Sequence, residues 1–149
     1  MKTDKEIDDI MLGMVRERAQ ELYSEMLLQH GINPRTYGAM EEPDAHARIT
    51  GDCGDTVEFY LRIREGRIEA ATFTTDGCMF SIASCSVAVE MATGRTLSQC
   101  IGINQSAIAD RLETIPADHE HCALLAAMTL QRAIRDYIDD RKRDPSSRA

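Results

Sequence analysis

Residues 56–64 read TVEFYLRIR and residues 67–75 read RIEAATFTT. Apolar and polar residues alternate along both stretches, a pattern typical of β-strands with one covered face. The connection between them is two residues long, which is the length of a tight hairpin. A shorter alternating stretch, HARIT, occupies residues 46–50. The sequence therefore predicts a three-stranded antiparallel sheet within residues 45–75.

A helical pattern precedes these strands. Apolar residues recur every three or four positions over residues 7–27, and Thr3 followed by Glu6 has the spacing of a capping box. Gly31 is placed to end the helix. The pattern predicts one long amphipathic helix, and we expect its apolar face to pack on the protein core.

Further helical segments follow the strands. Small and apolar residues over 79–93 predict a tightly packed helix, and a second helix begins near Asn104 and ends before Pro116. Residues 119–141 predict a long last helix. The expected fold class is α+β: a small three-stranded antiparallel sheet packed against several helices, with a long N-terminal helix and a long C-terminal helix.

The chain of 149 residues is expected to form a single domain, residues 1–149. Within it, residues 1–21 form an N-terminal helical extension and residues 142–149 a flexible polar tail. The formal charge of −8 argues against nucleic acid as a partner. No uncharged stretch approaches the roughly 20 residues that cross a bilayer, and the acidic N-terminus does not resemble a signal peptide. We therefore expect no membrane partner and a cytoplasmic location.

The five cysteines are the unusual feature of the composition. An odd number of cysteines without an export signal does not fit a disulfide framework. Packing residues, metal ligands and nucleophiles remain as roles for them. No two cysteines have the CxxC spacing that structural zinc sites usually use, so a site assembled by the fold is favoured over a zinc ribbon.

Three of the cysteines have neighbours with metal-binding chemistry. Cys53 precedes a predicted strand, and Asp55, two residues later, faces the same side of an extended chain. Cys78 opens a predicted helix, where the helix dipole favours the thiolate form. His121 and Cys122 adjoin in the first turn of the last helix, which favours a thiolate there too. These five side chains come from three connections that could meet at one edge of the sheet.

The remaining cysteines and a nearby histidine have simpler interpretations. Cys85 lies seven residues after Cys78 on one helix, about 10 Å along the axis, so these two cannot readily bind one ion. We interpret Cys85 and Cys100 as packing residues and His119 as an accidental surface histidine.

At these residues the sequence resembles the NifU/IscU family of iron-sulfur cluster assembly scaffolds. The resemblance covers about residues 22–142 and rests on CGD at 53–55, DGC at 76–78 and HC at 121–122. The interval between the second and third cysteines is similar to the IscU type and lacks the insertion of the zinc-containing SufU branch. The other matching stretches are YSE at 23–25, NPR at 33–35 with Gly38, IAS at 82–84, SVAVE at 86–90 and GRT at 94–96.

The resemblance implies that Cys53, Cys78 and Cys122 hold a cluster, that Asp55 modulates its stability and that His121 is an alternative ligand. Such scaffolds take sulfur from a cysteine desulfurase, combine it with iron into a labile 2Fe-2S cluster and pass that cluster to recipient apo-proteins. They are not enzymes with a turnover of their own. Cys122 is the thiol expected to receive sulfur as a persulfide.

An alternative is a zinc-bound SufU-like sulfurtransferase partner, which accepts persulfide and stimulates a cysteine desulfurase with zinc at the same residues. The chain also departs from the IscU pattern. Where those scaffolds carry a Pro-Pro-Val-Lys segment read by an Hsp70-type chaperone, residues 115–119 read IPADH, which argues against that partner. Cys85 stands where the family usually has serine. The extension at 1–21 suggests an added packing surface or a homo-oligomer contact.

Overall fold

A three-stranded antiparallel sheet forms one layer of the protein, whose computed structural model describes residues 3–143. The strands β1 (Ala45–Thr50), β2 (Thr56–Arg64) and β3 (Arg67–Thr75) lie in the order β1-β2-β3, as predicted. The hairpin residues Glu65 and Gly66 have φ angles of 53° and 74°. Positive φ at both positions gives the turn the twist that a two-residue hairpin needs.

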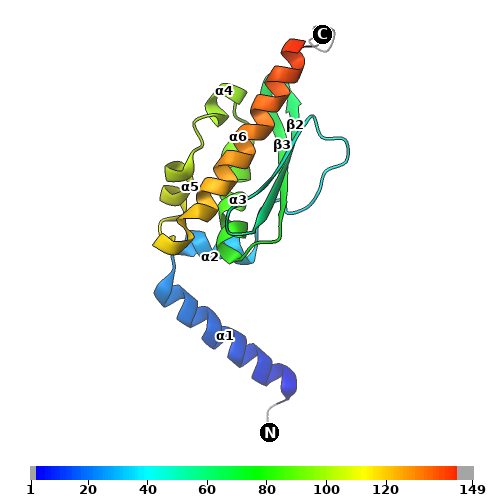
Figure 1. Ribbon diagram of the computed structural model, residues 1–149. Coiled ribbons are helices and arrows are strands. Elements are labelled where there is room, and N and C mark those ends of the chain that lie inside the picture. The colour runs from blue at the N-terminus through cyan, green and yellow to red at the C-terminus, as the bar shows by residue number, and fades with distance from the viewer. Residues whose placement is uncertain (1–2, 144–149) are drawn as a thin grey trace.

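Helices cover one face of the sheet (Figure 1). Both α3 (Met79–Ala92) and the long helix α6 (Glu120–Arg143) pack on the strands and on each other. On the sheet, alternate residues such as Phe59, Leu61 and Phe73 are fully buried beneath these helices. The remaining helices α2 (Glu25–Ile32), α4 (Leu97–Cys100) and α5 (Gln105–Leu112) and the short 3₁₀ helix η1 (Ala117–His119) complete this layer. The predicted α+β fold with a long C-terminal helix is confirmed.

The helix α3 is packed on all sides, against β3, α2, α5 and α6. Its small residues allow this close approach, and Ala83, Cys85 and Ala88 are completely buried. Cys100 is also completely buried, and its thiol donates to the carbonyl of Ala92 at 3.6 Å. Both cysteines are core residues, as their packing interpretation predicted.

The prediction of a single N-terminal helix is wrong, because the structure has two helices there. A separate helix α1 (Asp4–Leu22) precedes α2, and Ser24 begins α2 by accepting a hydrogen bond from the Leu27 amide at 3.1 Å. The Ser24 hydroxyl also donates to the Leu112 carbonyl, and the Ser24 amide donates to Thr114 Oγ1 at 2.6 Å. Contacts with the distant end of α5 therefore fix the break.

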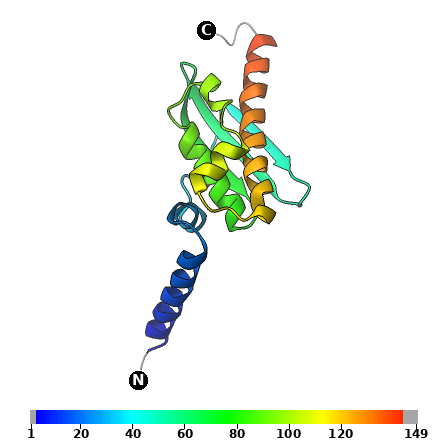
Figure 2. The same ribbon diagram turned by 90° about the vertical axis from the view of Figure 1, so that its left-hand side faces the viewer.

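The expected apolar contact with the core is wrong for α1, although Leu27, the last residue of the predicted apolar face, is completely buried in α2. The helix α1 projects away from the rest of the protein in both views (Figures 1 and 2). Its apolar residues Ile7, Ile10, Met11 and Met14 are between 44% and 64% exposed. The break before Ser24 turns the helix away from the core. The predicted capping box at its start is present. The Thr3 amide donates to Glu6 Oε2, and the Glu6 amide donates to Thr3 Oγ1.

Gly31 does not stop the helix, which runs one residue further to Ile32. A Cβ at position 31 would lie 2.5 Å from Met79 Cγ, so glycine permits the close approach of α2 to the start of α3. At the other end, α6 continues to Arg143, so part of the predicted tail is helical; residues 144–149 lie outside the described range. Between residues 3 and 143, no helix has both the length and the apolarity needed to span a bilayer.

A buried histidine joins α2 to α3. His30 is 1% exposed; its Nδ1 lies 2.7 Å from Ser86 Oγ and its Nε2 lies 3.0 Å from Glu90 Oε2. The Arg35 amide donates to the same Ser86 oxygen at 2.7 Å. Burial lowers the pKa of His30 below its usual 6.5, and this effect outweighs the opposing charge of Glu90.

We expect His30 to make the protein less stable as the pH falls below 6.5. The unfolded chain takes up a proton there while the folded protein resists it, so the stabilisation is complete above pH 6.5 and is lost below it. Urea unfolding at pH 7.5, 6.5 and 5.5 measures this dependence. His30→Gln is expected to be less stable at pH 7.5 but to lose less stability on acidification. If the wild-type protein and His30→Gln lost equal free energy of unfolding on acidification, that result would contradict the lowered pKa of His30.

Candidate metal centre

Three connections meet at one end of the sheet and bring the predicted donor side chains together. The β1–β2 loop supplies Cys53 and Asp55, the β3–α3 connection supplies Cys78, and the start of α6 supplies His121 and Cys122. Among the described residues, two groups have all their ligand atoms within 4.8 Å of one another. One group is Cys78, His119 and Cys122, and the other is Cys53, Asp55 and His121.

The loop that carries Cys53 is a tight turn closed by backbone hydrogen bonds. The Gly51 amide donates to the Asp55 carbonyl at 2.8 Å, and the Gly54 amide donates to the Gly51 carbonyl at 3.0 Å. Gly54 has a φ of 90°, a conformation that glycine adopts without strain. The turn leaves Cys53 exposed and Asp55 half-buried at the start of β2.

Cys78 is the N-cap of α3, as the sequence predicted. Its backbone is extended and its carbonyl accepts from the Ile82 amide at 3.0 Å, so the thiol lies at the positive end of the helix dipole. Gly77 before it has no room for a side chain. A Cβ there would lie 2.5 Å from Ser81 Oγ and 2.9 Å from Asp55 Oδ2. The glycine therefore lets the connection pass close to the carboxylate.

Ser81 links the two groups of donors and was missed in the sequence. Its side chain is 1% exposed, and its hydroxyl lies 3.2 Å from Asp55 Oδ2 and 3.3 Å from Cys122 Sγ. The hydroxyl has a single hydrogen, so it donates to one of these two atoms at a time. Its spacing of three residues from Cys78, on one face of the helix, was the feature that could have revealed it.

Cys122 differs from the other two predicted cluster cysteines because it is buried, with 2% exposure. Burial raises its pKa to about 11, although the hydrogen bond from Ser81 opposes the change. The neighbouring Cys78 and Asp55 also favour the neutral thiol. The thiolate expected from its first-turn position is therefore wrong for the metal-free protein: desolvation outweighs the helix dipole.

His119 is not an isolated surface histidine. Its ring stacks on Phe80 with the ring centres 4.1 Å apart, and its Nε2 lies 3.8 Å from Asp118 Oδ2. Its Nδ1 is buried and makes no hydrogen bond within the described part of the chain. The spacing of three residues between His119 and Cys122 could have indicated that both lie on one side of the helical start.

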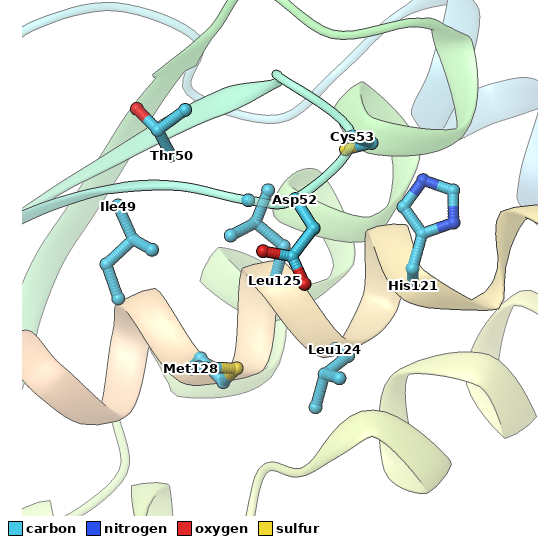
Figure 3. Close-up of a pocket in the computed structure, with 9 residues that line it drawn as sticks. Ile49, Thr50, Asp52, Cys53, His121, Leu124, Leu125 and Met128 are labelled. Carbon is cyan, nitrogen blue, oxygen red and sulfur yellow. The ribbon is translucent and has the colours of Figure 1, made fainter.

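An apolar recess of about 250 Å³ adjoins the donors. Cys53 and His121 lie near each other at one end of it, and Ile49 and Met128 line the other end (Figure 3). Leu124 and Met128 on its wall are 43% and 48% exposed. The donor cluster therefore opens toward solvent beside an apolar surface.

The assembled donors suit borderline and soft metal ions. Three thiols, two imidazoles and one carboxylate are ligands of zinc and iron, and imidazole and thiolate are the softer of these. His121 Nε2 lies 3.7 Å from Cys122 Sγ, so the two groups of donors adjoin. The set has fewer thiols than the four that hold a stable ferredoxin cluster.

Known proteins are similar to this chain over most of its length. Residues 22–144 match the family described as NifU-like N terminal domain. An iron-sulfur cluster assembly scaffold protein from Archaeoglobus fulgidus is 38% identical over 118 residues, 78% of this chain and 77% of the relative. One from Escherichia coli is 35% identical over 125 residues, 80% of this chain and 97% of the relative.

Solved structures share the fold. The N-terminal part of a nitrogen-fixing NifU-like protein from Brucella abortus superposes with a TM-score of 0.68 at 21% identity, covering 81% of this chain and 97% of that structure. The family match spans most of the chain and includes every donor of the candidate metal centre. The chain belongs to the NifU-like N-terminal domain family.

Proposed function

We propose that the protein is an iron-sulfur cluster assembly scaffold that builds a labile 2Fe-2S cluster and transfers it to apo-proteins. The observation that carries the proposal is the meeting of Cys53, Cys78 and Cys122 with Asp55 and two imidazoles at one end of the domain. The similar scaffold proteins from archaea and bacteria support it. The cluster is cargo in this proposal, and the protein has no catalytic turnover of its own.

The donor set favours release of a cluster. Four thiolates hold a cluster firmly, whereas a corner bound by a carboxylate or an imidazole exchanges more readily. Cys53 and Cys78 are exposed, so an acceptor protein can reach the cluster from their side. Asp55 is the hardest donor present and is the proposed labile corner.

Sulfur is proposed to come from a cysteine desulfurase, with Cys122 as the persulfide acceptor. A neutral, buried thiol is a poor nucleophile, and Cys122 is neutral at physiological pH in the metal-free protein. A bound metal ion deprotonates a coordinating thiol. Binding of iron is therefore expected to precede transfer of sulfur. A cytoplasmic location, where desulfurase and apo-proteins are available, belongs to the same proposal.

In the metal-free protein, Cys122 is expected to react with iodoacetamide more slowly than Cys53 and Cys78 at pH 7.5. Its rate should rise about tenfold per pH unit from pH 7 to 9 without a plateau, because its pKa is about 11. Mass spectrometry of peptides after timed alkylation measures each rate. Completely buried Cys100 serves as the unreactive control. Labelling of Cys122 as fast as that of Cys53, or a labelling rate that levels off near pH 8, would contradict the buried, neutral state of the Cys122 thiol.

Anaerobic incubation with a cysteine desulfurase, cysteine and ferrous iron is expected to produce visible absorption bands of a 2Fe-2S cluster. Cys53→Ala, Cys78→Ala and Cys122→Ala should each lose these bands, because each removes a cluster ligand. Cys85→Ala and Cys100→Ala, which change thiols of the core, are the matched controls and should keep them.

A normal cluster in all three ligand variants would rule out the scaffold assignment. Metal analysis of the anaerobically purified protein adds a second measure. Stoichiometric zinc together with strong stimulation of the desulfurase would instead support the zinc-bound sulfurtransferase partner.

Asp55→Ala is expected to slow cluster release by about tenfold, a size typical of changes around metal ligands. Without the hard carboxylate, an imidazole takes the corner and exchanges less readily. The rate of cluster transfer to an apo-ferredoxin, followed by absorbance, measures the effect. Asp52→Ala, in the same loop but outside both groups of donors, is the control and should transfer at the wild-type rate. Faster release from Asp55→Ala would argue against a labile carboxylate corner.

A further inference from the structure

His119 has the geometry of a metal ligand. We propose that His119, Cys78 and Cys122 together hold the first divalent iron or zinc ion that enters the centre, with one coordination position left open. The inference deepens the proposed function and rests on it for the role of that ion in cluster assembly. His119 lies outside the ligand set that the sequence resemblance implies, and its position carries lysine in IscU-type scaffolds.

The donor atoms of the two groups indicate which group binds a metal ion first. Cys78, His119 and Cys122 offer two sulfurs and one nitrogen, whereas Cys53, Asp55 and His121 offer one sulfur, one nitrogen and one oxygen. Zinc and ferrous iron bind thiolate and imidazole more tightly than they bind carboxylate in such sites. Three protein ligands with an open fourth position are typical of metal sites that exchange a ligand. The sulfur-rich group therefore takes the first ion.

The surroundings of His119 hold its ring in place. Phe80 lies in the first turn of α3, two residues after Cys78, and the stacked rings are inclined by only 27°. The same helix therefore positions both the Cys78 thiol and the His119 imidazole. A ring fixed before the metal arrives loses little conformational freedom on binding.

The two ring nitrogens of His119 have different surroundings. Nε2 faces the Asp118 carboxylate at 3.8 Å, and Nδ1 is buried without a hydrogen-bond partner in the described range. A histidine that binds a metal commonly directs its other nitrogen to a carboxylate. Nδ1 is therefore the nitrogen available to the ion, and stacking on Phe80 orients the ring.

The second histidine serves the other donor group. His121 is exposed, and its ligand atom lies with those of Cys53 and Asp55. The two imidazole rings are 6.1 Å apart, so each can bind its own ion. Ser81 bridges the groups through Asp55 and Cys122. A 2Fe-2S cluster takes four protein ligands, two to each iron ion, so each three-ligand group has more donors than its iron needs once a cluster is built.

Anaerobic titration of the metal-free full chain with Co²⁺ tests the assignment. The first equivalent is expected to give thiolate-to-cobalt charge-transfer bands, and competition with a chelating dye gives its affinity. His119→Ala should weaken binding of the first Co²⁺ at least tenfold. His121→Ala and Cys53→Ala, which change the other group, should leave the first affinity within twofold. Circular dichroism of each variant establishes that it is folded.

A second measurement uses the unmodified chain labelled with ¹⁵N-histidine. The first equivalent of Zn²⁺ should shift the ring nitrogens of His119 before those of His121. Wild-type first-ion affinity in His119→Ala, loss of the first ion in Cys53→Ala, or a shift of His121 first would each overturn the inference while the scaffold proposal stands. Failure of the wild-type chain to bind Co²⁺ or Zn²⁺ at all would overturn both.

Discussion

The close packing of α3 is the constraint on which the rest of the structure depends. Its small side chains let the sheet, α2, α5 and α6 all approach its axis, so its N-terminus has a fixed position relative to each of them. Cys78 begins this helix, and Ser81 in its first turn contacts both Asp55 and Cys122. The core therefore places one donor directly and aligns the connections that carry the others.

The donor cluster combines two environments within a few ångströms. Cys53 and Cys78 are exposed, whereas Cys122 is buried and its pKa is raised to about 11. An exposed thiol is accessible to partners, and a buried neutral thiol is protected from reaction until a metal ion removes its proton. Two thiols of the centre are therefore open to solvent, and the third is covered by the surrounding residues.

Local patterns predicted the sheet, because alternation and a two-residue connection encode a hairpin without help from distant residues. They also predicted Cys78 at a helix start. The patterns could not predict the break at Ser24, since the hydrogen bonds that fix it come from Leu112 and Thr114. Nor could they show that α1 leaves the core, because helical periodicity reveals an apolar face but not what covers it. The three-residue spacings of Ser81 from Cys78 and of His119 from Cys122 were visible in the sequence, but the contacts of Ser81 with Asp55 and of His119 with Phe80 come from distant segments.

By itself, the sequence determined the types of element, the cysteines with metal-binding neighbours and the family to which they point. Spacing and local chemistry suffice for these, because capping, periodicity and motif residues act over a few positions. Only the tertiary structure decided which donors lie close enough to share a metal ion and that the pKa of the Cys122 thiol is raised. Distances between Cys53, Cys78 and Cys122 depend on the packing of three separate connections. Burial, which sets the protonation of Cys122, exists only once α3 and α6 have come together.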